Sequence, residues 1–277
     1  MNPYLDKFLV DCETKGMTRH SIETYQSNVL EFFTYYPRPH EVTTDHLRFY
    51  LNKLRARNLA ISTLKGYMSA VSSFFDFLVF ENEIQLNPIP AFRKRYLDHI
   101  KYNPSARQLI SIREMQELYC AAPHILKKVI IMILAKTGIR RGELHDLKES
   151  DLDFYRKTIH IPEKKKRSNY ISFMDDEFEH TLKEYLVWGN RKAKTEYLLI
   201  SNKGGRIHKD RYGMILAELG RELHLHRNDR ALEAKLTPHC FRHWFTTNLF
   251  RSGMNSQYIK FLRGDSLRDE AWQIYNG

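Results

Sequence analysis

Apolar side chains recur at helical spacing along most of this 277-residue chain, and this pattern limits the folds open to it. In the first part of the chain, three stretches place an apolar residue every three or four positions, which is the spacing of one face of an α-helix. Their members are Ile22, Tyr25, Val29, Phe32 and Phe33; Leu47, Tyr50, Leu51 and Leu54; and Leu64, Tyr67, Met68, Val71, Phe74, Phe75 and Leu78. We expect Ser21 to cap the first helix and the aromatic residues to form a core.

The second part of the chain combines helices with a predicted β-hairpin. Ser111 and Glu114 fit the capping box, in which the two side chains satisfy free amides at the start of a helix. The run 125–135 is apolar on nearly every side, which predicts a central helix, and Gly138 is expected to end it. The runs 158–161 and 170–173 are typical of strands and flank a polar turn. A further helical pattern follows at Phe178, Leu182, Tyr185 and Leu186.

These patterns predict a mainly α protein with a small β-sheet and two domains. The sequence Asn-Pro-Ile-Pro at 87–90 is expected to end the third helix, because proline lacks an amide hydrogen and restricts the residue before it. A basic stretch with little periodicity follows. We therefore expect an N-terminal helical domain over residues 1–90, a linker over 91–106 and an α+β domain over 107–277.

The charge of the chain favours a polyanionic partner. Lys and Arg number 44 against 33 Asp and Glu, which gives a net charge of +11. Such an excess is typical of proteins that bind nucleic acid, although a solvated basic surface would give the same count. Arg93, Lys94 and Arg95 in the linker are expected to contact DNA phosphates, with a solvated hinge as the alternative.

Several features point to a reducing, cytoplasmic compartment. No apolar run approaches the roughly 18–20 residues that span a bilayer, and the N-terminus lacks the pattern of a secretory signal. The three cysteines lie far apart and have no metal-ligand spacing. We expect no membrane, metal or cofactor among the partners.

Two arginines, a histidine and a late tyrosine occur in an order that suits phosphodiester chemistry. Arg140 lies in the segment T-G-I-R-R-G-E-L, His239 and Arg242 lie in P-H-C-F-R-H, and Tyr275 follows. A guanidinium group can hold two phosphate oxygens in a planar fork. An imidazole can hydrogen-bond to phosphate or accept a proton near neutral pH, and a tyrosine oxygen can attack phosphorus.

Together these motifs resemble those of the tyrosine recombinases, the phage-integrase and Xer family, over nearly the whole chain. The resemblance implies a SAM-like helical DNA-binding domain and a catalytic domain that together form a C-shaped clamp on duplex DNA. It also implies strand exchange through a 3′-phosphotyrosine link and a Holliday junction, without metal or cofactor. The expected assembly is a dimer on each inverted-repeat site and a tetramer in synapsis, in the nucleoid of a prokaryotic host.

The resemblance implies a role for each motif residue. Tyr275 would be the nucleophile, Arg140 and Arg242 would hold the phosphate, and His239 would hydrogen-bond to the phosphate or accept the tyrosine proton. Glu143 is expected to fix a basic side chain, and His243 to be a buried supporting residue.

The general acid of the family is a lysine on a hairpin turn. Aligning the second strand places Lys164 there, with Lys165 and Lys166 as alternatives if the register slips. Lys165, Lys166 and Arg167 are otherwise expected to contact DNA.

One position departs from the family pattern. Most relatives carry histidine or tryptophan directly after the glycine, where this chain has Asp265. An ionised aspartate accepts hydrogen bonds and donates none, so we expect Asp265 to orient Arg263, Arg242 or His239. This departure and the short tail after Tyr275 favour an integrase of a virus or mobile element over an Xer-like dimer resolvase. A DNA-binding protein with a decayed site and a type IB topoisomerase remain alternatives.

Overall fold

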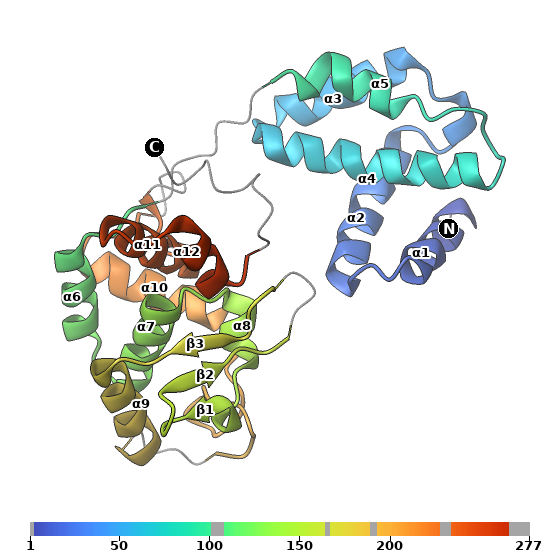
Figure 1. Cartoon of the computed structure of the whole chain (residues 1–277). Helices are drawn as coiled ribbons and strands as arrows, with labels where there is room; N and C mark the ends of the chain where they lie inside the picture. The colour runs from blue at the N-terminus through green and yellow to red at the C-terminus, as the bar shows by residue number, and fades with distance from the viewer. Residues whose placement is uncertain (1–2, 101–107, 164–166, 189–192, 228–233, 266–277) are drawn as a thin grey trace. The chain divides into compact units, whose positions relative to one another are not determined.

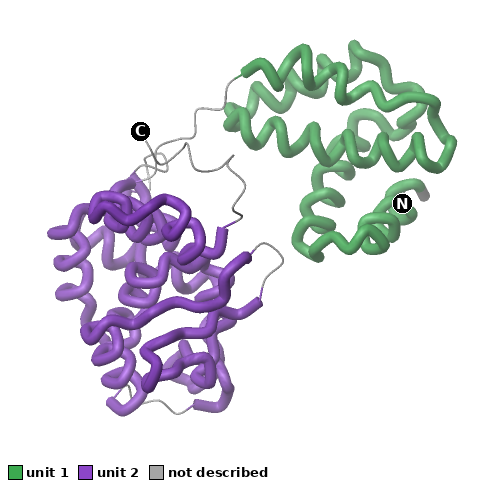
Figure 2. Tube along the Cα trace, in the orientation of Figure 1, with its two compact units in different colours: residues 1–103 green, residues 104–277 purple. Residues whose placement is uncertain are grey.

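The chain folds into two units that are both mainly helical. The computed structural model describes residues 3–100, 108–163, 167–188, 193–227 and 234–265 (Figure 1). The units comprise residues 1–103 and 104–277 and are coloured separately in Figure 2. The second unit contains a small β-sheet, so the predicted fold class, mainly α with a small sheet, is confirmed.

The first unit packs its helices around an aromatic core. Its elements are α1 (Pro3–Thr14), α2 (Arg19–Tyr35), η1 (Pro39–Glu41), α3 (Thr44–Ala56), α4 (Ile61–Phe80), α5 (Ile89–Arg93) and the π-helical turn η2 (Lys94–Asp98). Helix α4 contacts α1, α2, α3, α5 and η2. Phe32, Tyr50 and Phe74 are fully buried, so the predicted aromatic faces do form the core.

The predicted cap of α2 is wrong by three residues. The hydroxyl of Thr18 accepts a hydrogen bond from the backbone N–H of Ser21 at 3.3 Å, and the helix begins at Arg19. Both residues carry a hydroxyl and precede the same apolar face. Thr18 takes the role because its backbone is extended there, which is the conformation of an N-cap residue.

The predicted linker is wrong over its first half. Helix α4 already ends at Phe80, and two residues later Asn82 adopts the left-handed conformation (φ 60°). Pro88 and Pro90 begin α5 instead of separating domains, because the first turn of a helix leaves amide groups unpaired in any case. Residues 91–98 continue as α5 and η2, and the buried Phe92 and Leu97 join the core of the first unit.

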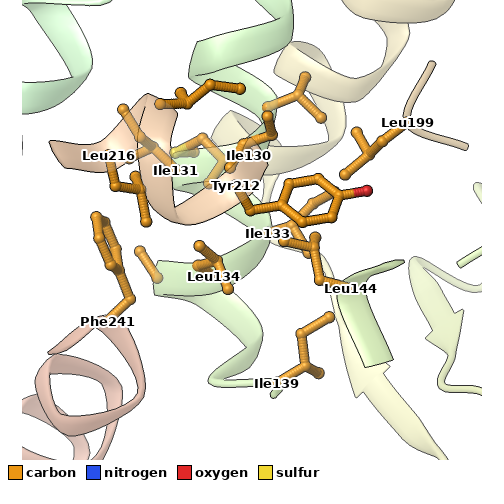
Figure 3. Packing of buried hydrophobic residues seen from close by; sticks show 14 of the residues in the cluster. Ile130, Ile131, Ile133, Leu134, Ile139, Leu144, Leu199, Tyr212, Leu216 and Phe241 are labelled. Carbon is orange, nitrogen blue, oxygen red and sulfur yellow. The ribbon is translucent and has the colours of Figure 1, made fainter. Parts of the chain in front are cut away.

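The second unit surrounds one buried helix. Its helices are α6 (Ile112–Ala121), α7 (Ile125–Thr137), α8 (Arg141–Asp146), η3 (Glu149–Asp151), α9 (Asp176–Trp188), α10 (Arg211–Glu222), α11 (Pro238–Arg251) and α12 (Ser256–Arg263). Helix α7 packs against α6, α9, α11 and β3 (Figure 1). Figure 3 shows Ile131 and Leu134 of α7 beside Leu216 of α10 and Phe241 of α11 in this core. The predicted central helix is confirmed.

The sheet is a three-stranded antiparallel meander of β1 (Leu152–Asp153), β2 (Thr158–His160) and β3 (Ile171–Phe173). The predicted hairpin corresponds to β2 and β3, with Ile159 opposite Ser172. The capping box of Ser111 and Glu114 is also present at the start of α6. Among the described residues, no helix is both long enough and apolar enough to cross a membrane.

Gly138 ends α7 and connects it closely to α11. Its φ of 59° is left-handed, and a Cβ at this position would lie 2.5 Å from Cδ1 of Phe245 on α11. A side chain would therefore be disfavoured both by the backbone conformation and by the packing. The predicted helix stop is confirmed, and it brings the start of α8 next to α11.

Candidate active site

Arg140 is the N-cap residue of α8. Its backbone N–H donates to Oε2 of Glu143 at 2.7 Å, and its Nη1 donates to Oε1 of the same carboxylate at 3.1 Å. The side chain of Arg140 is 40% exposed. Glu143 therefore fixes both the backbone and the guanidinium of Arg140, although the Arg140 side chain is only partly buried.

Glu143 also holds a second arginine in the interior. Arg167 Nη1 donates to Oε2 of Glu143 at 3.0 Å, and the Arg167 side chain is 0% exposed. Nη1 also donates to the carbonyl of Arg263, and Nε and Nη2 donate to the carbonyls of Asn169 and Leu262. Burial lowers the pKa of Arg167, and the charge of Glu143 opposes this effect.

The expected DNA contact of Arg167 is wrong on this geometry. Its guanidinium points inward and joins the connection between β2 and β3 to Glu143 and to the end of α12. Gly264 makes room for it, because a Cβ there would lie 2.6 Å from Cγ of Arg167. A basic run is commonly solvated, but its last residue here is a buried ion-pair partner.

Arg242 lies on α11 and is almost completely buried, with 2% exposed. Its Nη1 donates to the carbonyl of Gly138 at 2.6 Å, and its Nη2 donates to the carbonyl of Arg263 at 3.1 Å. Burial, together with the positive charge of Arg263, lowers the pKa of Arg242 to about 10, so the group is still a cation at neutral pH. The left-handed turn at Gly138 thus supplies an acceptor that positions Arg242.

Asp265 joins the two motif arginines. Its Oδ1 accepts a hydrogen bond from Nη2 of Arg140 at 2.6 Å and from Nη2 of Arg242 at 2.5 Å. Its Oδ2 lies 3.0 Å from Nη2 of Arg263, and its backbone carbonyl accepts from the hydroxyl of Ser168 at 2.7 Å. The structure therefore places Asp265 beside two of its three expected partners and adds Arg140. We call Arg140 and Arg242 the arginine pair.

His239 and His243 lie on α11 on either side of Arg242 in sequence. His239 is exposed in the first turn of the helix, and His243 is half-buried. Their rings meet edge to face, with centroids 5.0 Å apart. One turn of helix separates them, so both project from the same face.

The remaining predicted residues fall into two groups. Lys164, Lys165, Lys166 and Tyr275 lie outside the described residues. Of the basic trio on α5 and η2, Lys94 and Arg95 are exposed. Arg93 is half-buried, and its Nη1 donates to the hydroxyl of Ser69 at 2.9 Å.

The backbone of Arg263 is a part of the site that the sequence motifs do not indicate. Its carbonyl accepts from both Arg242 and Arg167, and its own side chain is buried against Asp265. No short motif signals a backbone acceptor, because any residue supplies the same carbonyl. In the ranges that the structure describes, no group of three or more His, Cys, Asp or Glu side chains could hold a metal ion.

Both parts of the chain resemble proteins of one known family. The model of the phage integrase family matches residues 108–276, and that of its N-terminal SAM-like domain matches residues 5–82. The tyrosine recombinase XerC of Roseiflexus castenholzii is 27% identical over 95% of this chain and 85% of its own length. XerC of Anoxybacillus flavithermus is 25% identical over 90% of this chain and 84% of its own length.

Solved structures show the same fold. The crystal structure of XerA recombinase covers all of this chain and 93% of its own at 25% identity, with a TM-score of 0.54. A lambda integrase dimer bound to a COC′ core site covers all of this chain and 95% of its own at 17% identity, with a TM-score of 0.78. With both family models matched in order along the sequence, the chain belongs to the phage integrase family.

Proposed function

We propose that this protein is a site-specific recombinase that cuts and rejoins DNA strands through a tyrosine–phosphate link. One observation carries the proposal: Arg140 from the start of α8 and Arg242 from α11 direct donors at the same oxygen atom of Asp265. Donors fixed around one anionic oxygen are what a phosphodiester needs when negative charge develops in its transition state.

Each chemical step has a proposed residue. The Tyr275 oxygen attacks phosphorus, forms a 3′-phosphotyrosine bond and releases the 5′-oxygen of the broken strand. The bond energy is retained, so the 5′-hydroxyl of a partner strand can attack the same phosphorus and release the tyrosine. The arginine pair neutralises the non-bridging oxygens, His239 exchanges a proton with the tyrosine or binds the phosphate, and Lys164 protonates the departing oxygen. Lys165 and Lys166 are the alternatives for that acid.

The rest of the described site supports the arginine pair. Glu143 binds Arg140 through two atoms and is itself held by the buried Arg167. The carbonyls of Gly138 and Arg263 fix Arg242. Because these partners hold the guanidinium groups before DNA arrives, little reorganisation is needed when the phosphate binds.

The proposed partner is double-stranded DNA with inverted-repeat sites. Similar structures include a lambda integrase dimer bound to a core site and a lambda integrase tetramer bound to a Holliday junction. We propose the same sequence of assembly for this chain, in the cytoplasm of a prokaryotic cell and on its nucleoid. Integration of a viral or mobile element is the proposed role, because Asp265 departs from the family pattern. Chromosome-dimer resolution is the alternative, favoured by the XerC relatives.

A suicide substrate tests the chemistry. DNA flanking the gene supplies candidate sites. With a nick close to the cleavage point, cleavage releases a short fragment that carries the free 5′-hydroxyl. This fragment diffuses away, so religation is prevented and the covalent complex is trapped. Wild-type protein should give an adduct that survives a denaturing gel, and Tyr275→Phe should bind the same DNA but give none. An adduct from Tyr275→Phe would refute the assigned nucleophile. No wild-type adduct on any nicked site would instead favour a decayed DNA-binding protein.

A further inference from the structure

Asp265 occupies the position between the arginine pair that the proposed function gives to a phosphate oxygen. Oδ1 accepts two charge-assisted hydrogen bonds, at 2.5 Å from Arg242 and 2.6 Å from Arg140. A non-bridging phosphate oxygen accepts the same donors at similar lengths, since both anions carry delocalised charge on oxygen. The carboxylate and a phosphodiester therefore compete for the same donors.

At Nη2 of Arg242 this competition is direct. Nη2 carries two hydrogens, and the carbonyl of Arg263 and the carboxylate of Asp265 take both. Nη1 also carries two hydrogens, and one of them donates to the carbonyl of Gly138. The two carbonyls belong to the backbone at the ends of α7 and α12, whereas Asp265 is a side chain with 23% of its surface exposed. Asp265 is thus the partner of Nη2 that can be exchanged.

Charge gives a second reason for exchange. A phosphodiester held by the arginine pair beside an ionised Asp265 would put two anions within contact distance. Like charges this close repel strongly where the surroundings are poorly hydrated, and Arg242 and Arg263 are both buried. Displacement of the carboxylate removes that repulsion and frees the Nη2 hydrogen in one step.

We propose that Asp265 is an internal competitor of the scissile phosphate. Asp265 holds the arginine pair in the DNA-free protein and is displaced when the phosphodiester binds. The proposal rests on the proposed function, in that the arginine pair is taken to bind phosphate. Free anions and randomly placed DNA must displace Asp265 with the energy of one phosphate contact. DNA whose scissile phosphate is placed at the arginine pair by contacts elsewhere in the protein supplies more binding energy. Asp265 therefore favours DNA that is bound with its cleavage point at the active site.

Inorganic phosphate tests the competition without any need for the target DNA. Its binding to the full-length protein is measured from the broadening of the ³¹P resonance. Asp265→Asn keeps the shape of the side chain and removes its charge, and we expect it to bind phosphate at least about tenfold more tightly than wild type, equivalent to roughly 1.4 kcal/mol. The same gain is expected for Asp265→Ala. This second variant tests the proposal even if the side-chain amide introduced by Asp265→Asn disturbs the fold.

Two controls locate the effect. Asp210→Asn removes the same charge from an exposed pair with Arg141 in the same unit, and should bind phosphate like wild type. Adding Arg140→Ala to Asp265→Asn should abolish the gain. Unchanged or weaker phosphate binding in both Asp265 variants would overturn the proposal and leave Asp265 as a residue that only orients arginines.

The phosphate measurement tests the competitor role of Asp265, and the adduct assay tests the proposed recombinase chemistry, so either hypothesis can be rejected without the other. Wild-type adduct formation without tighter phosphate binding in the Asp265 variants would reject the competitor and keep the recombinase. Tighter phosphate binding without any adduct would keep the competitor and reject the chemistry proposed for Tyr275.

Discussion

Arg140 and its neighbour Arg141 provide a matched pair of substitutions at the residue scale. Arg140 donates to Asp265, whereas Arg141 pairs with Asp210 on the surface. Arg140→Ala should slow covalent adduct formation by roughly a hundredfold or more, because a preorganised donor to a transition-state oxygen is lost. Its partly exposed side chain makes this variant less disruptive to the fold than Arg242→Ala. Single-turnover assays on a nicked substrate measure the rate.

Arg141→Ala controls for the loss of one positive charge beside the site. Its adduct formation should stay near the wild-type rate. If Arg140→Ala reacts as fast as Arg141→Ala, the phosphate is held by other groups and the arginine pair is wrongly assigned.

The identity of the general acid is a second residue-scale prediction. Replacing the 5′-bridging oxygen by sulfur gives a leaving group that departs without protonation. Lys164→Ala should cleave this modified DNA nearly as well as wild type and cleave normal DNA poorly, as seen in gel-based cleavage rates. If Lys165→Ala or Lys166→Ala shows this rescue instead, the hairpin register is displaced by one or two residues.

At the scale of elements, the buried pair of Glu143 and Arg167 joins α8 to the connection between β2 and β3 and to the end of α12. Glu143→Gln would leave the Arg167 cation buried without its counter-charge. We expect the free energy of unfolding to fall by about 3–5 kcal/mol, the usual cost of breaking a buried ion pair from one side. Urea unfolding measures it, and tryptophan fluorescence reports the second unit alone because Trp188, Trp244 and Trp272 all lie there.

An exposed pair on α6 is the matched control. Arg113 and Glu117 lie 2.9 Å apart with side chains 87% and 45% exposed. Glu117→Gln should change stability by at most about 1 kcal/mol, since water screens surface pairs. Equal effects of Glu117→Gln and Glu143→Gln would show that the buried pair contributes no more than a surface one.

Local patterns predicted the elements better than the contacts between them. The capping box at Ser111, the stop at Gly138 and the hairpin each depend on residues a few positions apart, and each is present. The inward turn of Arg167 depends on Glu143 and on the space left at Gly264, which are far away in sequence. Periodicity carries no information on such contacts, so the sequence pattern predicts a DNA contact for Arg167 and gives no sign of its internal ion pair.

The same limit applies to the candidate site. The motifs identified both arginines, because two guanidinium groups near a histidine suit phosphate chemistry. They did not indicate that Asp265 would contact Arg140, since that contact joins the start of α8 to the residues after α12. The fold itself brings these segments together, through the packing of α7 against α11 and of α11 against α12.

At the scale of the whole molecule, binding to DNA should depend steeply on salt. Each phosphate neutralised by Lys or Arg contributes about −0.9 to the slope of log affinity against log salt. If residues of both units contact the duplex backbone, the slope should be roughly −5 or steeper, since at least six or so phosphates would be engaged. Fluorescence anisotropy with labelled duplex at several salt concentrations measures it. A slope near −2 would indicate that only a small part of the basic excess faces DNA.

The end of the first unit makes this prediction specific. Lys94 and Arg95 are exposed. Arg93 instead donates from Nη1 to the hydroxyl of Ser69, and its Nη2 lies 3.6 Å from Oδ1 of Asp98. The double variant Lys94→Gln, Arg95→Gln should flatten the slope by about 1.8, two phosphate contacts' worth. It should weaken specific and random DNA alike, because phosphate contacts position a protein without reading sequence. Arg93→Gln should leave the slope nearly unchanged. If the double variant keeps the wild-type slope, η2 does not contact the DNA backbone and the basic stretch is a solvated surface.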